Sequence, residues 1–400
     1  MGYPVDWINL IVRWAHFVAG VSWIGASFYF VWLDNHLTAP QKVSDDADGV
    51  SGELWAVHGG GFYHNQKYLT GPKNEPLSEH LHWFKWEAYS TWITGMLMLA
   101  LIYWLEASTY LIDPAVLDLR PGVAIALSIG SLIVGWVVYD TLCKSLRSQP
   151  LVLGCSVFGF LVLMSWILFH TFSARAAFIH VGAIIGTIMV ANVAHVIIPG
   201  QRKMLAQIRA GREPDPTPGI LGKTRSVHNT YFTLPVLFTM ISNHYPMTYS
   251  TPYGWLVLAA IGLGGVLVRY FFLLTHKNKY VWGFPLVALL LLVGVAYLIR
   301  PHQSHFDKLG VRQSPAFAEV QPIITQRCAV CHAVHPRQPG YSAAPAGVLL
   351  DTPEHIASNV ARIDAQAVLT HNMPLGNLTK MTENERQLVG AWIAAGARDK

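Results

Sequence analysis

The sequence predicts an all-α membrane protein, in which an eight-helix transmembrane bundle is followed by a small soluble helical domain. Of the 400 residues, 52% are hydrophobic and only 13% are charged, whereas soluble chains carry about a quarter charged residues. The 14 tryptophans suit the two interfaces of a bilayer. Apolar runs recur up to residue 299 and then stop. Composition and pattern therefore indicate the same architecture.

Eight segments are long and apolar enough to be spanning helices, since a crossing takes about 20 apolar residues. They cover 9–33, 85–106, 122–142, 150–173, 175–198, 226–245, 253–275 and 280–299. The first is too long for the apolar core of a cleavable leader and has no basic residues before it, so we expect it to remain as a helix. The predicted organisation is a bundle over 1–300, a linker over 301–315 and a soluble domain over 316–400.

Basic residues predict the orientation of the bundle. The segment 199–225 holds the densest cluster of them, whereas 246–252 carries no charge at all. Basic loops stay in the cytoplasm, which places both termini outside. We therefore expect a bacterial inner-membrane protein that crosses the lipid bilayer several times, with its C-terminal domain in the periplasm. The net charge of +5 comes from such loops and does not indicate nucleic-acid binding.

The most specific motif lies in the soluble domain. Cys328 and Cys331 with His332 form C-x-x-C-H, the attachment sequence of a c-type haem. The two thiols would bind the porphyrin covalently and His332 would ligate the iron. We expect Met373 to be the second iron ligand, because a Met ligand raises the potential, with Met381 and His371 as rivals. A zinc or thiol-redox pair is the alternative, but it needs a second cysteine pair or a strand context.

The helix order of this domain agrees with the motif. We expect a helix over 315–326, the attachment motif, a helix over 353–370, the methionine loop and a C-terminal helix over 382–397. The sequence therefore predicts a small c-type cytochrome domain with one covalent haem c.

Histidines inside the predicted spanning helices point to further cofactors, because ionisable residues there are costly and functional by default. His180 and His195 lie 15 residues apart on one helix, roughly 22 Å along its axis and about 60° around it. Such a helix could hold one b-type haem near each surface, and Gly182 and Gly186 allow a porphyrin or a helix to approach closely. The other candidate b-haem ligands are His16 and His244 on the outer side and His228 or His82 on the inner side. Hydrogen bonding to neighbouring helices is the alternative role of each histidine. If the histidines bind haem, we expect one or two haem b groups.

Three residues are candidates for catalysis. Arg269 lies well inside 253–275, where it could hold an anionic substrate or a haem propionate, or extend to the interface. The segment 34–84 is polar and rich in histidine: His58 precedes three glycines, which suit close approach to a flat ligand, and His82 follows further on. Zinc binding by His80 and His82 is a weaker possibility, since no complete ligand set is visible.

These residues together resemble a known family, the bacterial membrane-bound urate oxidases (urate hydroxylases) that end in a cytochrome c domain. The resemblance covers essentially the whole chain. It rests on Arg13-Trp14-Ala15-His16 with Gly20, Trp23 and Gly25, on 79–87, on His195 with Pro199-Gly200-Gln201, and on 228–235 with 242–245. The first helix is also similar to the haem-binding helix of membrane protoporphyrinogen oxidases, which favours His16 as a haem ligand.

The resemblance implies an oxidoreductase that converts urate to 5-hydroxyisourate. Electrons would leave through the cytochrome c domain to a soluble cytochrome c or a terminal oxidase, without peroxide. Three other functions stay open on the residues alone. They are a quinol-to-cytochrome c electron-transfer protein without its own small-molecule substrate, a porphyrin-oxidising enzyme and, lowest in rank, a transporter with a haem tail.

Overall fold

The computed structural model describes residues 3–300, 315–339, 341 and 343–397. The predicted linker 301–315 therefore lies, except for its last residue, outside the described residues. Within them the chain is mostly helical, with one small two-stranded sheet.

All eight predicted apolar segments are helical. They are α1 (Tyr3–His36), α3 (Trp86–Leu99), α4 (Pro121–Ser145), α5 (Pro150–Phe169), α6 (Ala174–Ala191), α8 (Thr217–Ile241), α9 (Gly254–Thr275) and α10 (Gly283–Leu298). Over the described residues five helical stretches are long and apolar enough to cross a membrane, namely 7–36, 121–145, 150–169, 174–209 and 254–275. The helix α10 is apolar but shorter. The fold is therefore compatible with a membrane protein.

Two of the helices continue as π-helical turns. The helix α3 runs into η1 (Ala100–Trp104), which is followed by η2 (Ala107–Leu111). The helix α6 runs through η3 (Asn192–Ile197) into α7 (Ile198–Arg209). Pro199 lies at the start of α7, directly after the π-helical turn η3. The helix predicted to end at residue 198 therefore extends through the first part of the basic segment.

No helix or strand was predicted for the polar segment 34–84, but the structure has both there. The segment contains the short helix α2 (Val43–Asp48) and an antiparallel hairpin of β1 (Val50–His58) and β2 (Gly61–Tyr68). Gly59 and Gly60 both have positive φ, and His58 pairs with Gly61 across the turn. Asn-Gly-type and Gly-Gly turns close hairpins because glycine adopts these angles without strain. The three glycines therefore make a hairpin turn, and the all-α prediction is wrong for this segment.

The C-terminal domain packs short helices around its own core. The elements are α12 (Phe317–Arg327), η6 (Pro345–Gly347), α13 (Pro353–Ser358), α14 (Val360–Ile363), η7 (Asp364–Leu369), η8 (Leu375–Asn377) and α15 (Glu383–Ala394). The core is formed by Val320, Ile324, Ile356, Val389 and Trp392 with their neighbours. The single helix predicted over 353–370 is broken at Asn359, whose amide Nδ2 donates to the Leu349 and His355 carbonyls.

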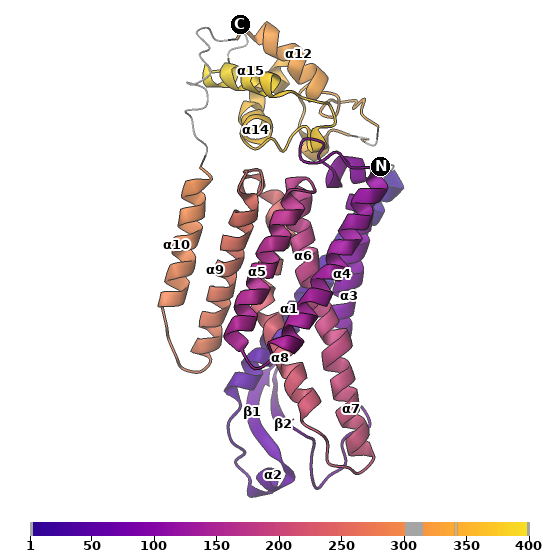
Figure 1. The fold of residues 1–400 in the computed structure, drawn as a ribbon, viewed down its shortest axis with the longest axis vertical. Helices are drawn as coiled ribbons and strands as arrows, with labels where there is room; N and C mark the ends of the chain where they lie inside the picture. Colours follow the sequence, from indigo (N-terminus) through magenta and orange to yellow (C-terminus); the bar gives the residue numbers. More distant parts are fainter. Residues whose placement is uncertain (1–2, 301–314, 340, 342, 398–400) are drawn as a thin grey trace.

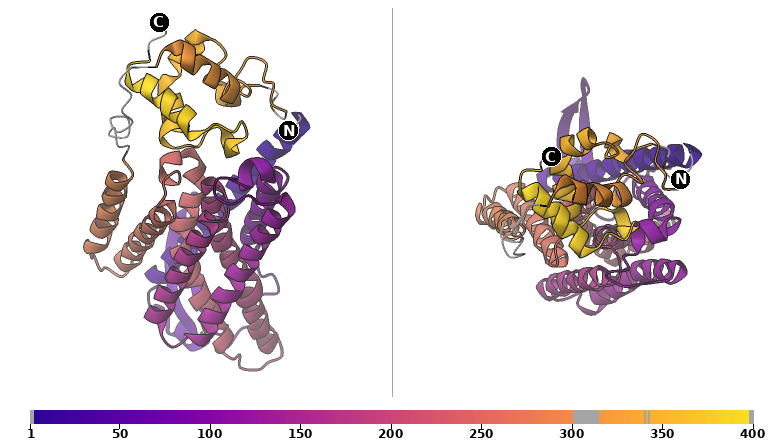
Figure 2. Two further views of the ribbon diagram at one scale, coloured as in Figure 1. Left: turned by 45° about the horizontal axis from the view of Figure 1, so that its top comes forward. Right: turned by 90° about the horizontal axis from the view of Figure 1, so that it is seen from above.

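The C-terminal domain lies at one end of the bundle, and the hairpin and α7 lie at the other (Figure 1). Seen from above, the domain covers part of the end of the bundle (Figure 2). The contacts that join the parts include the following two. The backbone of Gly376 lies against Thr109 in η2. Tyr249 follows the short helices η4 (Ser242–His244) and η5 (Pro246–Thr248), and its hydroxyl donates to Asn372 Oδ1 at 3.3 Å.

Candidate functional site

The C-x-x-C-H motif forms a tight turn directly after α12. Cys328 follows the last helical residue, and the N–H groups of Cys331 and His332 donate to its carbonyl oxygen at 3.1 and 3.0 Å. Both motif cysteines are free. Burial raises the pKa of the Cys328 thiol to about 12 and also raises the pKa of Cys331. Two protonated thiols and an imidazole are therefore held together on one turn.

His332 is held in one orientation by the backbone. Its Nδ1 lies 3.0 Å from the Val348 carbonyl oxygen, and its own carbonyl accepts from the Leu350 N–H at 2.7 Å. A carbonyl can only accept, so Nδ1 carries the proton and Nε2 keeps its lone pair. Burial lowers the pKa of His332, so the ring is neutral. Metal-binding histidines are oriented in this way, with the other ring N–H donated to a carbonyl or carboxylate.

The candidate second ligands differ in their surroundings. Met373 is half-buried; its N–H donates to the Gln366 carbonyl at 2.8 Å and its carbonyl accepts from Arg386 at 2.6 Å. Met381 is 3% exposed and packs inside the domain core. His371 is exposed. Met373 is therefore the thioether positioned beside the core, whereas Met381 fills it.

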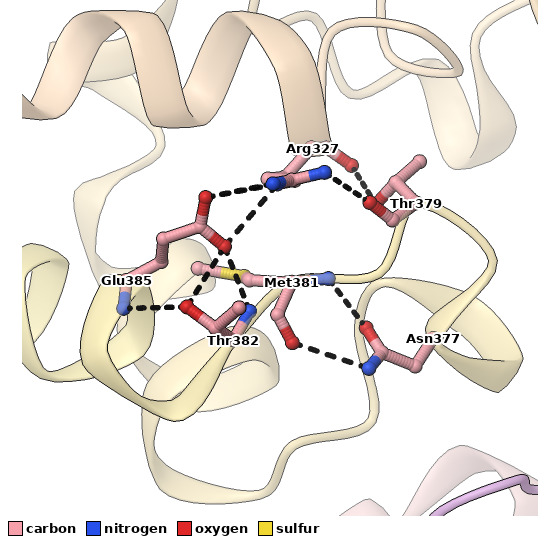
Figure 3. A network of polar contacts seen from close by, with 6 residues as sticks. All are labelled: Arg327, Asn377, Thr379, Met381, Thr382 and Glu385. Atoms are coloured by element: carbon pink, nitrogen blue, oxygen red, sulfur yellow. Dashed lines mark hydrogen bonds and ion pairs between the residues drawn. The ribbon is translucent and has the colours of Figure 1, made fainter.

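A polar network lies between α12 and α15 (Figure 3). Arg327, at the end of α12, forms an ion pair with Glu385 at 2.9 Å. Glu385 also accepts from the Thr382 N–H at 2.7 Å, while the Thr382 hydroxyl accepts from the Glu385 N–H at 3.2 Å. This capping box begins α15. Asn377 bonds both the N–H and the carbonyl of Met381. The network thus joins the helix before the motif to the C-terminal helix.

The residues present meet the requirements for a covalent haem c. Free thiols stand beside an imidazole with an available Nε2, and a half-buried thioether lies on a separate loop. Over the described residues no group of three or more His, Cys, Asp or Glu side chains is arranged to hold a metal ion. Neither a zinc site at the C-x-x-C pair nor one at His80 and His82 is therefore supported.

His180 lies at the centre of the bundle and is 0% exposed. Its Nδ1 donates to the Ala176 carbonyl at 2.7 Å, and its Nε2 lies 2.7 Å from the Ser128 hydroxyl. Since Nδ1 carries the proton, Nε2 accepts from that hydroxyl. Both ring nitrogens are occupied, so His180 would have to give up a hydrogen bond to ligate iron. Gly182 nearby lies against Thr239 of α8, which is a helix contact.

His195 differs from His180 in burial, although both rings lie beside residues of α4. It is exposed, and its ring lies 5.8 Å from that of Trp136. The expected offset of about 60° assumes a regular α-helix, but His195 lies within the π-helical turn η3. The i→i+5 bonding of a π-turn changes the helical register and displaces the following side chains around the axis. His244 is also exposed, in η4.

His16 and His228 each keep one ring nitrogen unoccupied in the described part of the chain. The Nδ1 of His16 donates to the Thr91 carbonyl at 3.0 Å, with the Thr94 hydroxyl 3.1 Å away, and its ring lies against Gly95. The Nδ1 of His228 lies 2.8 Å from the Tyr139 hydroxyl. His16 thus has the same arrangement as His332, with Nδ1 on a carbonyl and Nε2 free.

The three candidate catalytic residues lie apart in the fold. Arg269 is 5% exposed within α9, and its guanidinium lies 4.1 Å from the centre of the Phe28 ring. His58 is exposed at the hairpin turn. His82 is exposed and edge-on to Phe84 at 4.6 Å. Only Arg269 has the burial expected of a residue that holds a ligand away from water.

Sequence reasoning missed His276 and His36. The two rings lie 5.3 Å apart, where α1 and α9 end on the same side of the bundle. His276 Nδ1 is buried and has no partner in the described residues. The sequence does indicate their proximity, since each histidine lies at the end of a helix and the two helices run in the same direction across the bundle. It was overlooked because neither lies inside an apolar run.

Comparison with known proteins identifies the larger part of the chain. The model of the family described as "Urate oxidase N-terminal" matches residues 2–300, which include every apolar helix and Arg269. The match ends before the C-terminal domain. No curated protein and no solved structure matches the chain. Because the match covers well over half of the 400 residues, the chain belongs to the urate oxidase N-terminal family, and that family implies an oxidoreductase.

Proposed function

We propose that the protein is a membrane-bound urate oxidase that delivers its electrons to a haem c on its own C-terminal domain. The observation that carries the proposal is the pairing of His332 Nδ1 with the Val348 carbonyl, directly after two free motif cysteines. It supports iron ligation by Nε2 in a chain whose remaining part is related to urate oxidases. Met373 would provide the second ligand.

The reaction has a simple balance. Urate and one water yield 5-hydroxyisourate, two protons and two electrons. A haem c accepts electrons one at a time at a potential set by its axial ligands. The protein must therefore pass them on, and a soluble cytochrome c or a terminal oxidase is the acceptor we propose. His16, with its free Nε2, is the residue best arranged to hold a haem b on the bundle side.

The bacterial inner membrane is the proposed location. The helices suit a bilayer, and the basic residues of α7 lie at the end of the bundle opposite the C-terminal domain (Figure 1). Basic segments stay in the cytoplasm. This orientation supports a periplasmic C-terminal domain, the side on which soluble cytochromes accept electrons.

Membranes containing the protein test this function. Under anaerobic conditions we expect urate to reduce added soluble cytochrome c, with two cytochromes reduced per urate and no hydrogen peroxide. A Cys328→Ala/Cys331→Ala variant is expected to lose this activity, because the haem would no longer be attached. Peroxide formation in air, at a rate unchanged in the double variant, would contradict the proposal.

One observation favours a second function, the quinol-to-cytochrome relay. A groove of about 530 Å³ between α1 and α3 is lined by apolar side chains, Ser22, Ser90 and Glu87. Glu87 Oε2 is buried without a partner in the described residues. An apolar groove with one carboxyl group suits the head group of a quinol. Reduction of the haem by quinol but not by urate would favour this reading.

A further inference from the structure

Arg269 is a buried cation without a counter-charge. Its Nε and Nη2 atoms are inaccessible to solvent and have no hydrogen-bond partner in the described residues. The titratable groups that interact with it electrostatically are the Tyr231 phenol and the His276 imidazole, neither of which is a carboxylate, and its cation–π neighbour is Phe28. An isolated buried charge costs several kcal/mol, and arginines within apolar helices normally pair with an anion. The partner of Arg269 must therefore come from outside the described chain.

The acidic residue in the last turn of α1, Asp34, is already paired. Asp34 forms ion pairs with Lys67, at 2.6 Å, and with Lys223. These contacts hold the carboxylate against the hairpin and the start of α8. The carboxylate of Asp34 is thus already compensated by two lysines.

The neighbours of Arg269 add to the same preference. His276 directly follows the last residue of α9. Its Nδ1 is buried without a partner in the described residues, and its ring interacts electrostatically with both Arg269 and His36. The aromatic rings of Phe28 and Tyr231 border the guanidinium. Guanidinium and imidazole N–H groups are donors, and aromatic rings pack on flat ligands. The region therefore suits a planar anion that offers acceptor oxygens and nitrogens.

We propose that Arg269 and His276 form the subsite that binds the anion of the substrate, entered from the end of the bundle that carries the hairpin. This inference rests on the proposed function, which makes the anion urate. The guanidinium fork would take two adjacent acceptor atoms of the purine ring, as it does in carboxylates. His276 would donate to a third. A propionate of a non-covalent haem has the same charge and is the other source of such an anion.

The test compares variants of the full-length protein purified with its haem. The changes are Arg269→Gln, Arg269→Lys and His276→Gln, with the exposed Arg300→Gln as the matched control. KM and kcat for urate are measured by anaerobic cytochrome c reduction, and non-covalent haem is counted by extraction. Loss of a charge-assisted bond is expected to raise KM roughly 10- to 100-fold in Arg269→Gln. Smaller rises are expected in Arg269→Lys and His276→Gln, and none in Arg300→Gln.

The outcomes separate the inference from the function on which it rests. An unchanged KM in active Arg269→Gln protein would overturn the subsite. Loss of extractable haem from that variant would assign the guanidinium to a propionate and would also overturn it. If Arg269→Gln does not accumulate, Arg269→Lys and His276→Gln decide by the same KM criterion. A wild-type protein that urate does not reduce would instead overturn the proposed function itself.

Discussion

The Nδ1 atom of His332 lies 3.0 Å from the carbonyl oxygen of Val348. This contact links the attachment turn to the strand-like segment before Leu350 and determines which ring nitrogen is free. An imidazole oriented in this way does not need to reorganise when it binds iron. The contact is a backbone interaction, so its effect is best tested at the imidazole itself.

The change His332→Ala is expected to reduce urate-dependent cytochrome c reduction by more than roughly 100-fold, because the iron loses a ligand. Any non-covalent haem in the bundle should keep its spectrum. The matched control is His335→Ala, since His335 is exposed on the same segment. Equal losses in the two variants, or a vanished bundle haem in His332→Ala, would contradict the separation of the two domains.

The variants Met373→Leu and Met381→Leu distinguish a methionine that ligates the iron from one that only packs in the core. A thioether ligand raises the haem potential, so Met373→Leu is expected to lower the midpoint potential while Met381→Leu leaves it nearly unchanged. Met381→Ala, at a site 3% exposed, should lower the free energy of unfolding by about 2–5 kcal/mol. A redox titration and a urea unfolding curve measure the two effects. Exchange of the two results would make Met381 the ligand.

The ion pair of Arg327 and Glu385 predicts acid sensitivity of the C-terminal domain. Desolvation raises the pKa of Glu385, but the hydrogen bonds from Arg327 and Thr382 outweigh it and the net pKa is lowered. A carboxyl group with a lowered folded-state pKa contributes stability that is fully present above its unfolded pKa of about 4.3. That contribution is lost as the pH falls through the folded-state pKa.

We therefore expect Glu385→Gln to reduce the free energy of unfolding by about 1–2 kcal/mol at neutral pH, with the difference from wild type shrinking on acidification. Unfolding curves at several pH values measure it. Glu383→Gln is the control, because Glu383 is exposed and its only ion pair in the described chain is a long contact of 4.0 Å with His371. A difference that does not change with pH would show that the pair carries no net electrostatic stabilisation.

Docking of the C-terminal domain on the bundle can be tested at one glycine. Gly376 has a φ of +55°, and an added Cβ would lie 2.5 Å from the Thr109 carbonyl oxygen of η2. Gly347 has a φ of +65° with nothing within 4 Å of its Cβ position. Both Gly376→Ala and Gly347→Ala are expected to add backbone strain of about 1 kcal/mol. Only Gly376→Ala also pushes the C-terminal domain away from the bundle. Urate-driven reduction of the haem c should slow in Gly376→Ala alone, since electron transfer weakens steeply with distance.

The sequence was sufficient to predict the features that depend on local pattern. The eight apolar runs predicted eight helices, because runs of this length are helical by their own hydrogen bonding. The hairpin was missed because its turn glycines also suited a ligand cradle. The π-helical turn that contains His195 was not predicted, because such a turn depends on tertiary packing, which a helical period does not contain.

Candidate site residues could be named as one group only where the chemistry needs adjacent residues. The C-x-x-C-H motif is contiguous, so its cysteines and histidine could be named together. The pairing of His332 with Val348 and the proximity of Phe28 to Arg269 join residues from different elements. Nothing in either local sequence indicates these contacts, which arise when the elements pack.

The most direct test of the account is an anaerobic visible spectrum of the purified protein before and after the addition of urate. We predict that urate reduces the haem c, with one urate providing two electrons, and that His332→Ala protein shows no such change. A spectrum that urate leaves unchanged, in protein whose haem dithionite or a quinol still reduces, would contradict urate as the electron donor and favour the relay.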